Sequence, residues 1–91
     1  MKERILQACA DHFKCTVDDI KGLGRVKDIA KARTCAYFLL YTYWQGSPSS
    51  IARELCKNPG TVTRGIQRAN NSFFTGDYVH DDIQYLEGIL A

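Results

Sequence analysis

The segment from Ile51 to Ile66 limits the fold more strongly than any other part of the chain, because it carries two stretches of helical apolar spacing around a polar break. Ile51, Ala52 and Leu55 can pack one short helix inward, and Val62 and Ile66 can bury the inner face of a second. Two short helices that cross steeply over a tight turn need a small residue at their contact, and Ala52 supplies one. The pattern therefore predicts a helix-turn-helix.

Two proline-initiated helix starts support this prediction independently. Ser47 precedes Pro48 and Asn58 precedes Pro59, and the chain has no other proline. A serine or asparagine caps a helix by accepting a backbone N–H, and proline suits the first helical position because no partner is lost there. We therefore place the helix-turn-helix at about residues 48–73.

The leading turn of the second helix is the end that enters the major groove when a helix-turn-helix docks on DNA. The residues left exposed there are small, polar or cationic: Pro59, Gly60, Thr61, Thr63 and Arg64. Amphipathic helix pairs are common in all-α domains, and most of them bind no DNA. The Thr-Val-Thr-Arg run on a proline-initiated helix, in basic surroundings, nevertheless favours double-stranded DNA as the ligand.

Positive charge is unevenly distributed, although the net charge of the chain is only +2. Lysine and arginine concentrate in residues 21–33 and 48–70, whereas the chain from residue 71 onward carries acidic side chains and no lysine or arginine. Clustered cations attract phosphate. We predict one positive face, with an acidic C-terminal helix at about residues 77–90 turned away from it.

The 91 residues, 45% of them hydrophobic, are enough for one domain with a packed core. No alternating strand pattern occurs, and the spacing predicts an all-α bundle of about six helices. These are expected over residues 2–14, 17–21, 28–45, 48–56, 59–73 and 77–90, with Thr16 as a cap and Gly46 as a stop. No apolar run is long enough to span a membrane and no signal peptide is seen, so we expect a cytoplasmic protein.

A basic loop, residues 21–28, separates the second and third expected helices. Its Gly22-x-Gly24 spacing follows no strand and precedes no Gly-Lys-Ser/Thr, so we expect no nucleotide site.

The four cysteines, Cys9, Cys15, Cys35 and Cys56, form no Cys-x-x-Cys pair and show no zinc-ligand spacing. We interpret them as reduced, mostly buried thiols, and expect neither a metal nor a cofactor. A nucleophilic cysteine needs a base, for which His12 is the candidate beside Cys9 or Cys15. The simple amphipathic pattern of that helix favours a structural role, and an enzyme is the least favoured class.

Three segments carry a resemblance to a known family. Residues 17–20, V-D-D-I, are similar to its V-x-D-L segment, and residues 29–39 to its hxxARQxAMYL helix. Residues 47–52, S-P-S-S-I-A, are similar to its S-L-P-E-I-G segment. With the order of elements over residues 5–73, they resemble the C-terminal DNA-binding domain of the bacterial replication initiator DnaA. The resemblance implies a Trp-repressor-like fold and DNA binding in replication initiation or its regulation.

In that family a basic-loop arginine enters the minor groove while the helix-turn-helix reads the adjacent major groove. By position, the resemblance makes Arg25 that arginine and places Lys27 near the DNA backbone. The family's recognition signature, G-G-R-D-H-S/T-T-V, is matched here by Thr-Val at residues 61–62, whereas Asn58 and Pro59 replace the aspartate and histidine. The family's own DNA box is therefore no guide to the target. We expect a stand-alone relative without the ATPase domain, of the kind that a phage or mobile element encodes.

The predicted DNA-binding residues are basic, small or able to hydrogen-bond. They are Arg25, Lys27, Lys31, Arg53, Lys57, Asn58, Gly60, Thr61, Thr63, Arg64 and Arg68. Arg64 is the candidate for a bidentate guanine contact, and the other cations position the duplex through its phosphates.

Two alternatives stay open. One is a protein-interaction module that docks a partner helix on Tyr41, Tyr43 and Trp44, and the other is a small phage-type transcription regulator. A second copy of the chain and a replication protein are further partners that the sequence leaves open.

Overall fold

Helices joined by short connections make up the part of the chain that the computed structural model describes, residues 2–24 and 26–90. In chain order they are α1 (Lys2–His12), α2 (Val17–Lys21), α3 (Lys27–Leu39), α4 (Pro48–Leu55), α5 (Pro59–Thr75) and α6 (His80–Leu90). A π-helical turn, η1 (Leu40–Trp44), continues α3. No strand occurs among these described residues, and the predicted all-α fold is confirmed.

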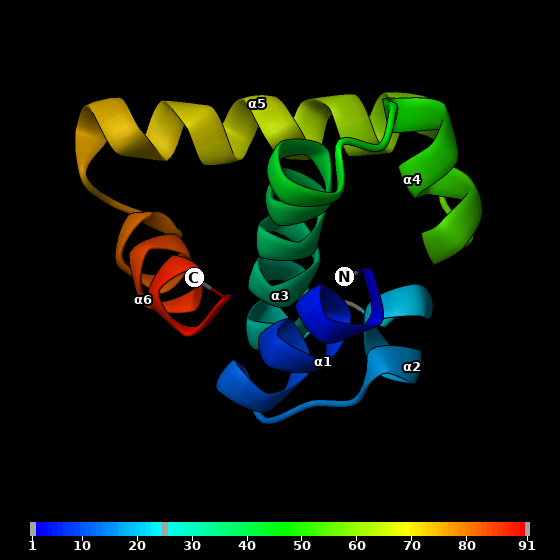
Figure 1. Ribbon diagram of the computed structural model, residues 1–91, viewed down its shortest axis with the longest axis horizontal. Coiled ribbons are helices and arrows are strands. Elements are labelled where there is room, and N and C mark those ends of the chain that lie inside the picture. Colours follow the sequence, from blue (N-terminus) through cyan, green and yellow to red (C-terminus); the bar gives the residue numbers. More distant parts are fainter. Residues whose placement is uncertain (1, 25, 91) are drawn as a thin grey trace.

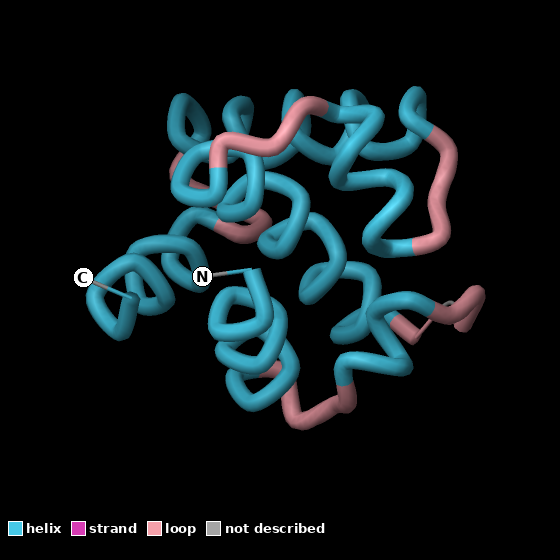
Figure 2. The backbone as a smooth tube through the Cα atoms, turned by 45° about the vertical axis from the view of Figure 1, so that its right-hand side comes forward, coloured by secondary structure: helices cyan, strands magenta, loops and turns pink. Residues whose placement is uncertain are grey.

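Helix α3 forms the axis of the molecule, on which α1, α2, α5 and α6 pack, while α4 packs mainly on α5 (Figure 1). The long helix α5 lies across the C-terminal end of α3, while α1 and α2 lie near its N-terminal end. Helix α4 and the first turn of α5 are at one end of the molecule, and α6 is at the opposite end (Figure 1). The tube in Figure 2 follows the same path from helix to helix through short loops. Helix α4 and the leading turn of α5 are therefore remote from the acidic C-terminal helix, which α5 approaches only at its own C-terminal end.

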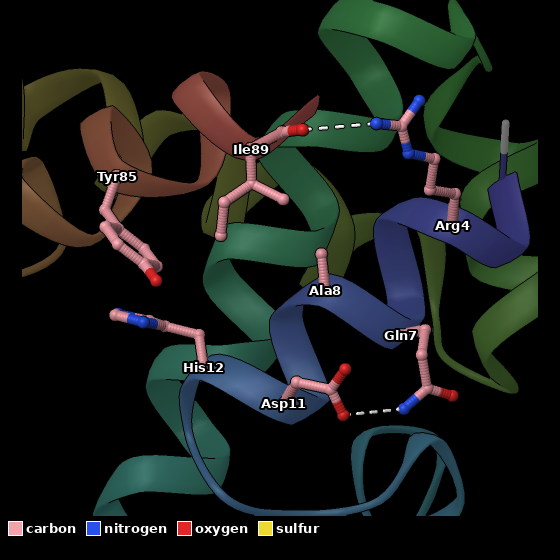
Figure 3. Close-up of a pocket in the computed structure, with 7 residues that line it drawn as sticks. All are labelled: Arg4, Gln7, Ala8, Asp11, His12, Tyr85 and Ile89. Carbon is pink, nitrogen blue, oxygen red and sulfur yellow. Dashed lines mark hydrogen bonds between the residues drawn. The ribbon is translucent and has the colours of Figure 1, made fainter. Parts of the chain in front are cut away.

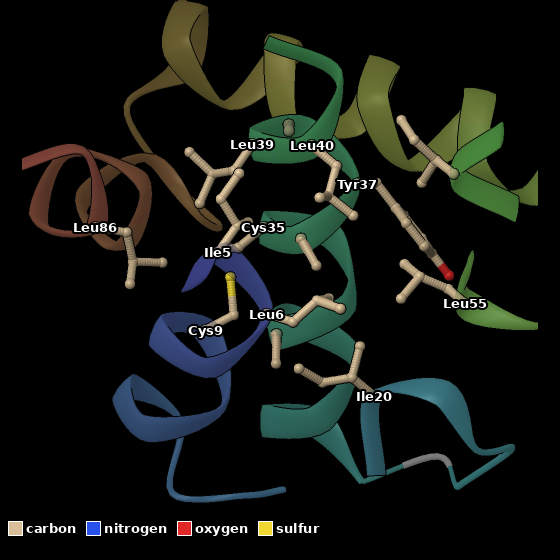
Figure 4. Close-up of a cluster of buried hydrophobic side chains, with 14 of the residues drawn as sticks. Ile5, Leu6, Cys9, Ile20, Cys35, Tyr37, Leu39, Leu40, Leu55 and Leu86 are labelled. Atoms are coloured by element: carbon tan, nitrogen blue, oxygen red, sulfur yellow. The ribbon is translucent and has the colours of Figure 1, made fainter. Parts of the chain in front are cut away.

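The core lies around α3 and receives side chains from every other helix. Ile5, Ile20, Leu55, Val62 and Leu86 come from five different helices, and each is fully buried. Several of them surround the α3 ribbon in Figure 4. Complete burial of an aliphatic side chain of this size contributes ~1.5–3 kcal/mol. This shared core fixes the position of the helix-turn-helix relative to the rest of the fold.

The end of the central helix differs from the prediction that it runs to Gln45 and stops at Gly46. Regular α-helix ends at Leu39, the π-helical turn follows, and Gln45 ends it in the left-handed region at φ 60°. Gly46 is needed for space instead, because a Cβ there would lie 2.5 Å from the ring of Trp44.

Two other helix ends are also corrected. Helix α1 ends at His12 rather than near Lys14, which has a left-handed φ of 57°. Helix α6 begins at His80 rather than near residue 77, because Tyr78 has a φ of 51° that no α-helix contains. The predicted bounds of α2 and its Thr16 cap are confirmed.

Gly65 lets α5 approach α3 closely, because a Cβ built there would lie 2.2 Å from a ring carbon of the buried Tyr37. Gly65→Ala is expected to lower the free energy of unfolding by ~1–2 kcal/mol, since overpacking costs up to ~3 kcal/mol and the gain in helix propensity is only ~1 kcal/mol. Urea unfolding followed by circular dichroism measures the change.

Gly88 provides a matched control in α6. A Cβ at that position would meet nothing within 4 Å. Gly88→Ala is therefore expected to stabilise the protein by ~0.5–1 kcal/mol, through helix propensity alone. Equal effects of the two substitutions would contradict the close approach of α5 to α3.

Candidate nucleic-acid interface

Both helices of the helix-turn-helix are capped as the sequence predicts. The Ser47 hydroxyl accepts the backbone N–H of Ser50 at 3.2 Å, and the Asn58 carboxamide oxygen accepts that of Gly60 at 2.8 Å. Pro48 and Pro59 each follow a cap and occupy the start of α4 and α5.

Cys56 makes the turn between the two helices. Its φ of 57° is left-handed, which is uncommon for a residue other than glycine, and its N–H donates to the carbonyl of Ala52. This cysteine is exposed and Cys15 is half-buried, so only Cys9 and Cys35 are buried thiols. The prediction of mostly buried cysteines was wrong at the turn, because backbone geometry and not packing determines that position.

The leading turn of α5 faces outward. Asn58, Pro59, Gly60, Thr63 and Arg64 are exposed, Thr61 is half-buried, and Val62 and Ile66 point into the core. The Thr63 hydroxyl donates to the carbonyl of Pro59 at 3.0 Å, which leaves its methyl group and lone pairs for a ligand. Arg64 forms no hydrogen bond or ion pair with any described residue, so its guanidinium is free to bind a ligand.

Arg33 binds the end of α2, a role that the sequence analysis missed. Its Nε donates to the carbonyl of Ile20 at 2.9 Å, and Nη2 donates to those of Asp19 at 2.9 Å and Gly22 at 2.8 Å. Nη1 donates to the carbonyl of Gly24. The last carbonyls of a helix have no partner within it, and in α2 the backbone N–H of Gly22 reaches only the carbonyl of Asp19. A helix of five residues that ends in this way is the signal that would have predicted such a cation.

Lys57 also points inward rather than to solvent. Its ammonium donates to the carbonyl of Lys21 at 3.0 Å and to that of Gly22. Burial, together with the nearby Arg33 guanidinium, lowers the pKa of Lys57 from its ordinary value. The basic loop and the turn of the helix-turn-helix are therefore joined directly.

The remaining predicted cations differ in what surrounds them. Lys27 and Arg53 are exposed. Lys31 and Arg68 converge on the ring of Tyr78. Nζ of Lys31 lies 5.9 Å from the ring centroid, and Cζ of Arg68 lies 4.2 Å from it. Cation–π contacts of this kind hold a cation near the surface without neutralising it.

The predicted separation of charge is incomplete at Lys31. This side chain lines a shallow depression together with Asp28 and Asp82. Asp82 comes from the acidic helix, which packs on α1 through a 2.8 Å contact between its carboxylate and Nε2 of His12. The first turn of α6 thus lies beside one of the predicted phosphate ligands.

The predicted minor-groove arginine, Arg25, lies outside the described residues. Its sequence neighbourhood is exposed, with 87% of Leu23 and 60% of Val26 accessible to solvent. The structure therefore presents apolar side chains from the basic loop at the surface.

A shallow pocket lies between α1 and α6 (Figure 3). Its side chains bind one another: the His12 ring stacks on Tyr85 with centroids 4.8 Å apart, and Arg4 donates to the carbonyl of Ile89 at 3.1 Å.

Burial raises the pKa of Cys9 to about 12, which keeps the thiol protonated at neutral pH. A thiolate nucleophile beside His12 therefore has no support in this geometry.

Within residues 2–24 and 26–90, no group of three His, Cys, Asp or Glu side chains is arranged to hold a metal ion. None of the helices in this part of the chain combines the length and apolar character needed to cross a bilayer.

Comparison with known proteins agrees with this architecture. The family model described as the bacterial dnaA protein helix-turn-helix matches residues 2–69. The chain is also 31% identical over 86 residues to the chromosomal replication initiator protein DnaA of Bdellovibrio bacteriovorus. The aligned region covers 93% of this chain but only 18% of that protein. Since the family model covers most of the chain, including the capped helix pair, the protein belongs to the bacterial DnaA helix-turn-helix family.

Proposed function

We propose that this protein binds double-stranded DNA with sequence preference, in replication initiation or its regulation. The observation that carries the proposal is the exposed leading turn of α5, with Arg64 between one and two turns beyond the Asn58 cap and unpaired among the described residues. A helix N-terminus of this kind fits the major groove, where base edges present distinct patterns of donors and acceptors.

In the proposed complex, Arg64 donates to O6 and N7 of a guanine. Thr61 and Thr63 meet a thymine methyl or a phosphate, and the backbone approaches closely at Gly60. The Asn58 oxygen accepts the Gly60 N–H, so its two amide donors and one lone pair of that oxygen remain for DNA.

Phosphate contacts flank this reading element. The exposed Lys27, Arg53 and Arg68 position the duplex, with Lys31 weakened by the carboxylates beside it. The basic loop lies against the turn of the helix-turn-helix through Lys57. Arg25 is proposed to enter the minor groove next to the major groove that α5 reads.

The role in replication is proposed from the name of the relative in Bdellovibrio bacteriovorus and from family membership. The match covers 18% of that protein, and no other activity of the relative is carried over to this chain. The target sequence is expected to differ from the family's, since Asn58 and Pro59 stand in place of its aspartate and histidine.

The alternative of an aromatic docking surface has less support. The Trp44 ring is half-buried beneath the Lys2 ammonium, 5.4 Å from its centroid, and the Tyr43 hydroxyl donates to Glu87 at 2.6 Å. Tyr41 is 49% exposed and is the one member of this trio without a described side-chain partner. Two of the three side chains therefore have internal contacts, although the Tyr43 ring is itself 41% exposed.

Selection from random duplex oligonucleotides, followed by gel shift of the enriched sequences, tests the proposal. A retarded complex at low salt and an enriched motif are expected. If no duplex is retarded at low salt, DNA binding is excluded and a protein-interaction module becomes the better explanation.

Arg64→Ala is expected to raise the Kd for the selected duplex by ~5- to 150-fold and to relax preference at one base position, because a bidentate contact is worth ~1–3 kcal/mol. Fluorescence anisotropy on matched and single-substituted duplexes measures both effects. Arg4→Ala removes the same charge beside α6 and is expected to leave affinity and selectivity unchanged. Unchanged selectivity in the Arg64 variant would assign the base contact to another residue.

A further inference from the structure

We propose that Lys57 is a positioning residue that fixes the basic loop to the helix-turn-helix, so that both elements meet DNA as one rigid unit. This inference rests on the DNA binding proposed above. It assigns Lys57 to the architecture of the interface, whereas its charge and place in the sequence had suggested a phosphate ligand.

The contacts of Lys57 join three elements at one point. Lys57 follows α4 directly, and its ammonium reaches the carbonyls of Lys21 and Gly22, 36 and 35 residues away. The Gly22 carbonyl also accepts Arg33 Nη2 of α3 at 2.8 Å. The end of α2, the central helix and the turn of the helix-turn-helix therefore share a single acceptor.

The end of α2 explains why two cations tolerate each other there. The last carbonyls of a helix carry partial negative charge and lack partners within the helix. Gly22 donates its own N–H to Asp19, and the cations satisfy carbonyls that would otherwise face solvent. Hydrogen bonds from charged donors are shorter and stronger than neutral ones, so the arrangement holds the start of the loop in place.

Arg53 shows what a cation without this role looks like in the same motif. It lies in the last turn of α4, is exposed, and forms no hydrogen bond or ion pair among the described residues. Lys57 is half-buried and points back into the protein. The two side chains carry the same charge, but Lys57 is bound to the end of α2 whereas Arg53 is exposed, which makes Arg53 a matched control.

Loss of the Lys57 contacts is expected to uncouple the loop from α5 while both remain folded. Arg25 would then contribute little to DNA binding, because the loop would no longer be held at the correct distance from the recognition helix. Loss of a simple phosphate ligand would instead leave the contribution of Arg25 unchanged.

A double-mutant cycle on the selected duplex distinguishes these cases. The factor by which Arg25→Ala weakens binding of the selected duplex is measured by anisotropy in the parent, in Lys57→Met and in Arg53→Met. The loss is expected to be equal in the parent and in Arg53→Met, and at least ~5-fold smaller in Lys57→Met, a coupling within the range of residues that act together. Equal losses in all three backgrounds would overturn the proposal.

Hydrogen exchange of the free protein tests the same contact without DNA. The amides of Ile20 and Gly22, which donate to Thr16 and Asp19, are expected to exchange faster in Lys57→Met and at the parent rate in Arg53→Met. Unchanged exchange in Lys57→Met contradicts the proposal even if DNA binding is confirmed. Faster exchange in a protein that binds no duplex would support the contact while the proposed function fails.

Circular dichroism establishes that each variant is folded before it enters the cycle. If Lys57→Met is unfolded, Lys57→Gln replaces it, because glutamine retains a donor on a shorter side chain. Its coupling to Arg25 is expected to be partial, and additivity in that variant would overturn the proposal equally.

Discussion

Leu55→Ala is expected to lower the free energy of unfolding by ~2–5 kcal/mol, the largest effect that we predict for a single truncation of the helix-turn-helix. Leu55 is the last residue of α4 and is completely buried in the cluster that surrounds α3. Its removal takes apolar atoms out of the core and leaves a cavity that the rigid helices around it fill only in part. Since domains of this size are stable by only ~5–15 kcal/mol, a substantial share of the stability depends on this side chain.

Leu23→Ala is the matched control, because this leucine is 87% exposed in the basic loop. Its effect on stability is expected to stay within ~0.5 kcal/mol. Urea unfolding followed by circular dichroism compares the two variants under the same conditions. A loss in Leu55→Ala no larger than that in Leu23→Ala would mean that α4 does not pack on the core as the structure has it.

Local sequence signals predicted the helix-turn-helix because they act over a few residues. The Asn58 and Pro59 pair sets the start of α5 through one hydrogen bond and one fixed dihedral angle. The burial of Val62 and Ile66 follows from helical spacing alone. Such features need no knowledge of the rest of the fold.

Contacts between distant segments were beyond the same reasoning. Lys57 and Arg33 were counted as surface charges, whereas both donate to the end of α2. Nothing in the spacing of a lysine indicates a carbonyl 36 residues away. The position of Asp82 beside Lys31 likewise depends on how α6 packs, which charge patterning along the chain does not specify. The sequence therefore supplied candidate residues for the site but not the direction in which each side chain points.

Raising the salt concentration from 50 to 200 mM is expected to weaken binding of the selected duplex by ~500-fold, because each phosphate contact releases condensed counterions. Five cations other than Arg64 are proposed to neutralise phosphate charge: the exposed Lys27, Arg53 and Arg68, the half-buried Lys31, and Arg25. About five neutralised phosphates correspond to a slope of about −4.5 for the logarithm of affinity against the logarithm of salt concentration. Anisotropy titrations at several salt concentrations measure the slope.

Two charge-matched variants show whether the slope comes from the placement of the cations or from net charge alone. Arg53→Gln is expected to reduce the magnitude of the slope by about 1, because one phosphate contact is lost. Arg4→Gln lowers the net charge equally, but its guanidinium donates to the carbonyl of Ile89 beside α6, and the slope is expected to stay at the parent value. Equal slopes for the two variants would mean that general attraction to a cationic protein, and not a defined face, accounts for DNA binding. Different slopes would place the phosphate backbone along the helix-turn-helix, because counterions are released only where cation and phosphate meet.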